Sequence, residues 1–78
     1  IKYNFSGSTK SVTIRIFDFG MNLVKTVIQN VNREGEREYI DNWNGRDENN
    51  SIVPNGVYFY RIDVGNDDPL YGKIMVLM

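Results

Sequence analysis

Short apolar stretches separated by turn-forming residues are the feature that most constrains this chain. Six such stretches follow one another at intervals of roughly 8–12 residues, and no segment has the hydrophobic period of an amphipathic helix. This spacing is typical of a β-sandwich or β-barrel rather than of alternating strands and helices. The sequence therefore predicts an all-β fold, either a sandwich or a barrel.

The clearest local pattern is a β-hairpin in the first half of the chain. Residues 12–17 alternate apolar and polar side chains, and the turn formers at 18–22 lead into a second apolar run at 23–28. Residues 1–5 alternate in the same way and predict an edge strand. The next reversal is expected at three turn-forming residues, Asn30, Asn32 and Gly35.

The second half of the chain predicts three further strands. Residues 36–40 carry a more polar pattern, which favours a half-exposed strand. In residues 57–64 the even-numbered side chains are apolar and are expected to face the core. A last strand is expected from about residue 70 to residue 78.

The connection between the fourth and fifth strands contains two turn signals, Asn44-Gly45 and Pro54-Asn55-Gly56. Glycine favours the positive φ angles of such turns. Trp43 stands where a strand enters this connection, so we expect its ring to plug the end of the core with its indole N–H bonded to backbone. Structural roles are thus assigned to Trp43, Gly45, Gly56 and the core-strand residue Tyr58.

Composition predicts a single folded domain spanning residues 1–78. With 41% hydrophobic and 13% aromatic residues the chain is too apolar for a disordered segment. A chain of this size buries only roughly 60–65% of its unfolded surface, so the stability margin should be thin. Because Ile1 begins no signal-peptide pattern, we expect an excised or processed part of a larger protein.

Charge and residue usage exclude several classes of function. The formal net charge is −1 and the charges are dispersed, which argues against binding to nucleic acid. No apolar run approaches the roughly 20 residues that span a bilayer. The chain lacks cysteine and histidine, the usual thiol nucleophile and the commonest base and metal ligand near neutral pH. An enzyme would have to work with carboxylates, lysine, tyrosine or serine instead. We expect no enzyme activity and no cofactor, and we expect protein partners rather than a small-molecule ligand.

Three acidic residues around the only tryptophan offer candidate chemistry: Asp41, Asp47 and Glu48. Paired carboxylates beside an aromatic ring occur in sugar hydrolysis, but acids are also common in turns, where they bond local amides. Oxygen donors in the same stretch suggest a calcium-binding loop as a second candidate. Counting from Asp47, however, the sixth and twelfth positions of an EF-hand loop hold Ile52 and Tyr58 rather than glycine and glutamate. An irregular calcium site stays open beside the reading as a solvated turn.

Four aromatic residues are candidates for a platform on which sugars stack: Phe17, Tyr39, Trp43 and Phe59. Packing in the core is the competing interpretation. Phe17 and Phe59 are expected on strand faces opposite the core. If both are exposed there, they form a candidate patch for a protein partner.

Four motifs occur in order along the chain. Residues 12–24 place V-T-I-R-I-F-D before Gly20 and Val24, residues 43–47 read W-N-G-R-D, residues 53–62 read V-P-N-G-V-Y-F-Y-R-I, and residues 73–77 read K-I-M-V-L. These motifs resemble the immunoglobulin-like domain of the flagellar hook-capping protein, related forms of which end many exported bacterial proteins. The resemblance covers nearly the whole chain and implies an immunoglobulin-like, two-sheet antiparallel sandwich of about six to seven strands, without catalytic residues.

The resemblance also implies a function. Such domains serve as non-catalytic C-terminal modules of exported bacterial proteins, in secretion sorting, surface anchoring or domain-domain interaction. In the Bacteroidetes-type lineages they are tails that direct the parent protein through type IX secretion to the cell surface. The implied partners are the rest of the parent chain and the secretion machinery. By resemblance, the sorting signal lies in two segments, Gly56-Val57-Tyr58 and Lys73-Ile74-Met75-Val76-Leu77.

Two other roles stay open. One is a structural assembly domain like that of the hook cap, and the other is a carbohydrate-binding accessory module of a polysaccharide-active enzyme. The asparagine-proline motif that often opens the sorting tails is absent from this sequence.

Overall fold

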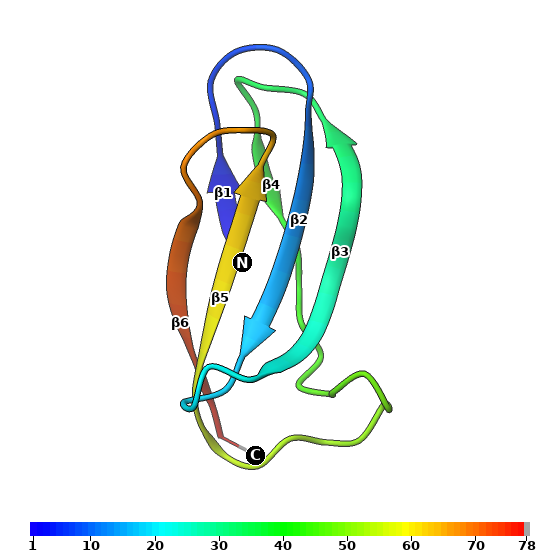
Figure 1. Ribbon diagram of the computed structural model, residues 1–78, viewed down its shortest axis with the longest axis vertical. Coiled ribbons are helices and arrows are strands. Elements are labelled where there is room, and N and C mark those ends of the chain that lie inside the picture. The colour runs from blue at the N-terminus through cyan, green and yellow to red at the C-terminus, as the bar shows by residue number, and fades with distance from the viewer. Residues whose placement is uncertain (78) are drawn as a thin grey trace.

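The computed structural model describes residues 1–77, which form six β-strands (Figure 1). No helix forms within this range. All strand pairs are antiparallel, so the predicted all-β class with two antiparallel sheets is confirmed. The strands are β1 (Lys2–Asn4), β2 (Lys10–Phe17), β3 (Leu23–Arg33), β4 (Glu38–Ile40), β5 (Gly56–Val64) and β6 (Leu70–Val76).

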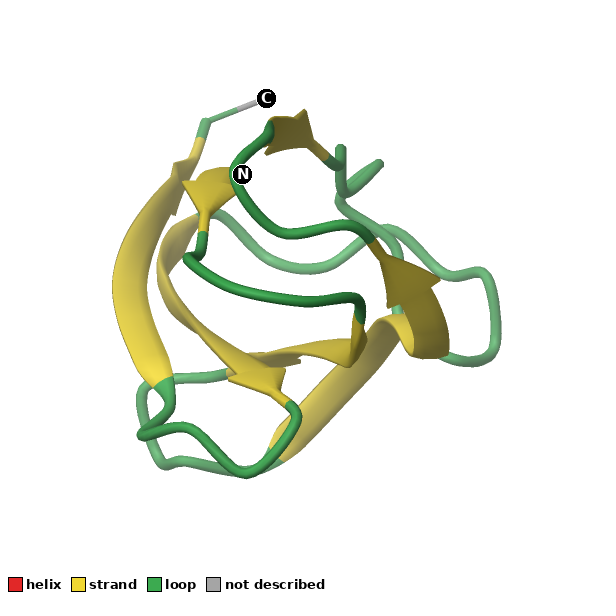
Figure 2. Cartoon of the chain, turned by 90° about the horizontal axis from the view of Figure 1, so that it is seen from above, coloured by secondary structure: helices red, strands yellow, loops and turns green. Residues whose placement is uncertain are grey.

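The two sheets differ in size. The larger sheet has the strand order β3-β2-β5-β6, and the smaller one pairs β1 with β4. Seen along the long axis of the molecule, the strands surround a central core (Figure 2). The molecule is elongated, with extents of 38 × 20 × 19 Å, so its two ends are well separated.

The two central strands, β2 and β5, supply the deepest part of the core. Their side chains alternate between the inside and the outside of the sheet, as the pleat of a strand requires. The alternation predicted for residues 12–17 and 57–64 is therefore confirmed. Five side chains are at most 2% exposed: Val12, Ile14, Ile16, Ile62 and Val64.

Buried side chains form two clusters along the long axis. The first contains Tyr3, Phe5, Val12, Ile14, Ile62 and Val64. The second contains Ile16, Val53, Tyr58 and Val76. Three partly buried residues pack against both clusters and join them: Ile1, Val27 and Tyr60.

Strand β3 is longer than the sequence pattern predicted, because it continues to Arg33. Asn30 lies inside the strand with a φ of 52°, where the pairing with β2 slips by one residue. Its N–H donates a hydrogen bond of 3.0 Å to the Thr13 hydroxyl. The reversal predicted at Asn30 and Asn32 is therefore wrong, because a side chain on the neighbouring strand holds this left-handed residue as a bulge.

Three other strands are shorter than predicted. Strand β1 comprises Lys2–Asn4 rather than residues 1–5, β4 comprises Glu38–Ile40 rather than residues 36–40, and β6 ends at Val76 rather than at residue 78. Met78 lies outside the described residues.

Three connections meet at one end of the sandwich, which we call the polar end: residues 5–9, 34–37 and 65–69 (top of Figure 1). The Glu36 N–H donates to the Phe5 carbonyl at 2.7 Å, and its carboxylate accepts the Gly7 N–H at 2.8 Å. A Cβ atom on Gly35 would lie 2.1 Å from the Gly7 carbonyl oxygen, so only glycine fits there. No large apolar side chain is exposed in these three segments.

Candidate interaction surface

The opposite end of the sandwich, which we call the apolar end, comprises residues 18–23, 41–56 and 75–77 (bottom of Figure 1). Its first segment is the tight turn between β2 and β3. The Asp18 carboxylate accepts the Asn22 N–H at 2.9 Å, and the Asp18 N–H donates to the Asn22 carbonyl at 3.0 Å. This acid is thus engaged in closing the turn, while Phe19 between them extends into solvent.

Trp43 packs against the second core cluster from this end. Its indole N–H donates to the Arg46 carbonyl at 2.9 Å, and its ring meets that of Tyr58 edge-on, with 5.3 Å between centroids. The ring is half-buried rather than fully enclosed. Gly45 is buried in the adjacent turn with a φ of 74°, which favours glycine. Together these contacts fix the path of the chain out of β4.

The loop of residues 47–51 holds itself together through one carboxylate. Oδ1 of Asp47 accepts the N–H groups of Asn49 and Ser51 at 2.9 and 3.0 Å. The neighbouring Glu48 fastens the loop to the edge of β3, because its N–H donates to the Val24 carbonyl and its carboxylate accepts the Thr26 N–H at 2.6 Å. The carboxylates of Asp47 and Glu48 therefore hold the backbone of this loop in place.

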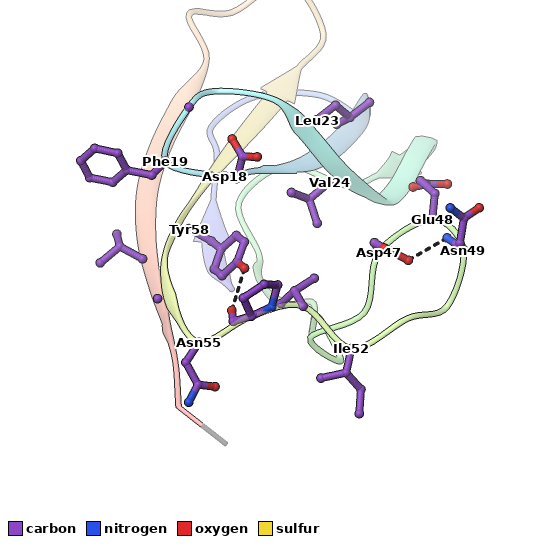
Figure 3. A pocket seen from close by; sticks show the side chains of 15 residues that line it. Asp18, Phe19, Leu23, Val24, Asp47, Glu48, Asn49, Ile52, Asn55 and Tyr58 are labelled. Carbon is purple, nitrogen blue, oxygen red and sulfur yellow. Dashed lines mark hydrogen bonds between the residues drawn. The ribbon is translucent and has the colours of Figure 1, made fainter.

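A pocket of about 630 Å³ opens between the β2–β3 turn, the 47–53 loop and the start of β5 (Figure 3). Val24 and Tyr58 point toward it, and the Tyr58 hydroxyl donates to the Pro54 carbonyl at 2.7 Å. Val53 forms part of its wall and is buried in the second core cluster. The pocket therefore reaches from the solvent down to the core.

Large apolar side chains form the rim of this pocket. Phe19 is 78% exposed, Ile52 is 60% exposed and Leu23 is 52% exposed. In Figure 3 these side chains stand apart around the pocket, with Phe19 on the β2–β3 turn and Ile52 on the long connection. Exposed apolar groups around one opening mark a candidate surface for contact with another protein. Met21, Met75 and Leu77 are also exposed at this end.

The four aromatic residues considered as a sugar platform do not come together. Tyr39 stacks on Tyr3, with 5.6 Å between centroids, whereas Trp43 packs against the other core cluster. Phe17 and Phe59 pair across β2 and β5 on the opposite face and are both half-buried. These two rings therefore do not form the exposed patch that was considered. Instead, the exposed ring of Phe19 lies against Phe59, with 6.2 Å between centroids.

The two segments assigned by resemblance to a sorting signal lie side by side. Strands β5 and β6 pair Gly56 with Val76, Val57 with Met75, and Tyr58 with Ile74. Tyr58 and Val76 are buried in the second core cluster. Lys73, Met75 and Leu77 are exposed. The segments thus form one two-stranded unit, which combines core residues with solvent-facing ones.

Asp41, the third acid near Trp43, belongs to a buried network. Its carboxylate accepts hydrogen bonds from the Tyr3 hydroxyl at 2.7 Å and from Arg33 at 3.1 Å. Burial, followed by the hydrogen bond to Asp41, raises the pKa of the Tyr3 hydroxyl well above its ordinary value. Within residues 1–77 no three acidic side chains come close enough together to hold a metal ion.

The sequence interpretation missed the apolar rim. Phe19, Leu23 and Ile52 stand beside turn residues and outside any alternating pattern, and this position was the available signal. It also missed Gly72, whose Cβ would lie 2.1 Å from the ring of Tyr60. That contact joins β5 to β6 and cannot be read from either strand alone.

Residues 1–68 match the family model described as the FlgD Ig-like domain. The chain belongs to this family. The matched range ends before β6, so it includes the hairpin, the tryptophan turn and β5, but not the last strand. No curated protein and no solved structure matches the chain.

FlgD Ig-like domains are typically non-catalytic, and the geometry of this one agrees with such a role. Asp18, Asp41, Asp47 and Glu48 each bond to backbone or to a neighbouring side chain. None of the described residues belongs to a helix long and apolar enough to cross a membrane. The apolar end is thus the surface of this FlgD Ig-like domain that most needs a functional explanation.

Proposed function

We propose that this FlgD Ig-like domain is a non-catalytic terminal module of a larger exported bacterial protein, and that it docks through its apolar end. The observation that carries the proposal is the rim of Phe19, Leu23 and Ile52 around a pocket that reaches the core. The docking partner is another domain of the parent protein or a component of the export and anchoring machinery. Surface sorting and anchoring are the roles that such docking serves.

Apolar surface that is exposed to water favours association with another surface. Burying such surface is favourable by about 25 cal/mol per Å², so the three exposed side chains around the pocket provide a driving force for association. At the polar end, by contrast, no large apolar side chain is exposed in the connecting segments.

The structure of the acids supports binding rather than chemistry. A catalytic carboxylate needs a free oxygen facing a substrate, together with a partner group at a defined distance. Here Asp47 and Asp18 hold their own loops, and Asp41 is held by Tyr3 and Arg33. These bonds keep the loops in place, and fixed loops present the apolar rim as a defined surface.

In sorting, the secretion machinery would recognise the two paired segments at residues 56–58 and 73–77. Their exposed members, Lys73, Met75 and Leu77, run from the outer face of the large sheet to the apolar end. A receptor that contacts the rim would therefore lie next to this part of β6. We expect the two surfaces to act together in sorting.

The test is a reporter fused to the N-terminal side of residues 1–78 and expressed in a type IX-competent host. The fused reporter is expected at the cell surface or in the medium, while the unfused exported reporter stays in the periplasm. Equal periplasmic retention of both would rule out the sorting role and leave domain-domain contact. A fusion with Trp43→Ala, which should weaken the fold, is the control for dependence on the folded domain.

A structural assembly role is the second candidate, because an apolar rim can also bind a second copy. Sedimentation velocity over a range of concentrations separates the two. Concentration-dependent assembly that Phe19→Ser abolishes favours assembly. A monomer at all concentrations favours docking to a different protein.

A further inference from the structure

The two edges of the large sheet are protected to different degrees. At β3 the Glu48 side chain and backbone bond to Val24 and Thr26, and the pairing with β2 has three register shifts. Bulges and covering loops are means by which proteins keep edge strands from pairing with other chains. No such bond from another segment reaches β6 in the described part of the chain, where its partner is β5.

Strand β6 is also regular. Seven consecutive residue pairs join it to β5 without a register shift, from Gly56–Val76 to Ile62–Leu70. Its central glycine, Gly72, lies under the ring of its cross-strand partner Tyr60, so the ring covers the position where a side chain is missing. The outer edge of β6 therefore presents an ordered row of alternate backbone N–H and C=O groups, the template for an added strand.

The side chains on the outer face of β6 define what such a strand would carry. Tyr71 and Met75 are 64% and 60% exposed, and Lys73 lies between them at the centre of the strand. Lys73 forms no ion pair within residues 1–77. The nearest cation on β5, Arg61, bonds to Asp63 at 2.9 Å. The centre of this edge thus has an unbalanced positive charge flanked by two apolar groups.

This charge argues against a second copy of the chain as the added strand. Two β6 strands paired along their full length, antiparallel about their centres or parallel in register, would place Lys73 opposite Lys73, and like charges directly opposite each other destabilise a pair of strands. Among the ten acidic residues of the chain, one has apolar side chains two positions away on both sides, namely Asp41 between Tyr39 and Trp43. Its carboxylate is already bonded to Tyr3 and Arg33.

We propose that the outer edge of β6 binds an extended segment of a different protein as an added β-strand. The segment carries an acidic side chain opposite Lys73 and apolar side chains two residues before and after it, against Tyr71 and Met75. This pattern reads the same in both directions, so it applies to a parallel or an antiparallel strand. The surface differs from the pocket rim and goes beyond the proposed docking of the apolar end.

The test is a titration of isotope-labelled residues 1–78 with the peptide STVTETVTS, followed by NMR. Backbone amides of β6 are expected to shift and to become protected from hydrogen exchange, with a dissociation constant of about 1 mM or tighter. The peptide STVTKTVTS should bind at least about tenfold more weakly, because its lysine faces Lys73. Phe19→Ser should leave this binding unchanged, which separates it from docking at the apolar end.

The charge-reversed variant Lys73→Glu is the decisive control. It should exchange the preference, binding the lysine peptide more tightly than the glutamate peptide. The glutamate peptide with N-methyl groups on alternate residues of one edge should lose binding, while methylation of the other edge should preserve it. Three results would each overturn the proposal: equal binding of both peptides by Lys73→Glu, amide shifts confined to residues 18–23 and 47–56, or no amide shifts at about 5 mM peptide.

Discussion

At the polar end, Gly35 and Gly7 bring two backbones into direct contact, whereas at the apolar end the loops around residues 18–23 and 47–53 stand apart and leave a pocket of about 630 Å³. Both ends join strands of the same two sheets. The polar end uses short connections with hydrogen bonds between them, and its exposed side chains are polar. The apolar end uses a longer connection and exposes Phe19, Leu23 and Ile52.

The difference shows how a small sandwich can separate stability from binding. The connections of the polar end are tied to one another, so changes there should be felt by the whole fold. At the apolar end stability comes from side chains that point inward, above all Trp43 and Tyr58, while the rim residues contribute little. At the apolar end, the loss of stability on substitution should therefore depend on whether the side chain points inward. At the polar end, it should depend on whether the residue takes part in a contact between backbones.

Trp43→Ala is expected to have the largest effect. The half-buried ring packs on the second core cluster, so its loss should reduce the free energy of unfolding by about 3 kcal/mol. Trp43→Phe should lose roughly half as much, because it keeps a ring but not the indole hydrogen bond to Arg46. Urea denaturation measures both. A loss below about 1 kcal/mol for Trp43→Ala would mean that this ring does not support the apolar end.

Gly35→Ala should be next, at about 2 kcal/mol, because the added Cβ meets the Gly7 carbonyl and one backbone has to move. The matched control is Gly20→Ala in the turn of the apolar end. There the Cβ would meet the movable Asn22 side chain at 3.1 Å, so the loss should be smaller. Thermal unfolding of the two variants compares the ends directly. Equal losses would contradict the tighter backbone packing of the polar end.

Tyr3→Phe tests the buried network behind the first core cluster. Because the folded state raises the pKa of Tyr3, the unfolded chain loses this proton first, and stability should fall as the pH rises above about 10. One such group contributes at most about 1.4 kcal/mol per pH unit. Denaturation at pH 8 and above pH 10 should show a smaller alkaline loss for Tyr3→Phe than for the natural chain. Tyr71→Phe, on an exposed ring, is the control and should keep the full loss.

The smallest effect on stability is expected for the rim. Phe19→Ser together with Ile52→Ser removes two side chains that are mostly in solvent, so the free energy of unfolding should change by less than about 1 kcal/mol. Chemical denaturation checks this result. A larger loss would mean that the rim is part of the core, and the contrast between the two ends would fail.

Local patterns were sufficient for the parts of the fold that depend on one strand at a time. The alternation in residues 12–17 and 57–64 predicted the buried apolar side chains of β2 and β5, though not the burial of Thr13, and turn residues located the β2–β3 hairpin. Contacts between distant segments decided the rest. Asn30 stays within β3 because of Thr13, and Gly35 is required because of Gly7. No pattern within one segment reports such a neighbour.

The candidate site followed the same division. The acids and aromatic rings that attracted functional interpretations in the sequence are mostly engaged in the fold, as Asp47 and Trp43 illustrate. The rim residues drew no attention because a single phenylalanine in a turn has no pattern around it. Their common exposure became visible only when the turn and the long connection were brought to the same end of the molecule.

The most direct test of docking through the rim compares the two ends of the domain in one localisation assay. Reporter fusions would carry the rim variant Phe19→Ser with Ile52→Ser, or a matched polar-end variant, Glu34→Ser with Arg37→Ser, which removes an exposed ion pair. Both variants should fold. If the domain docks through the rim, the rim variant loses the localisation conferred by the natural domain and the polar-end variant keeps it. Normal localisation of the rim variant, or loss of localisation in the polar-end variant alone, would show that the rim is not the docking surface.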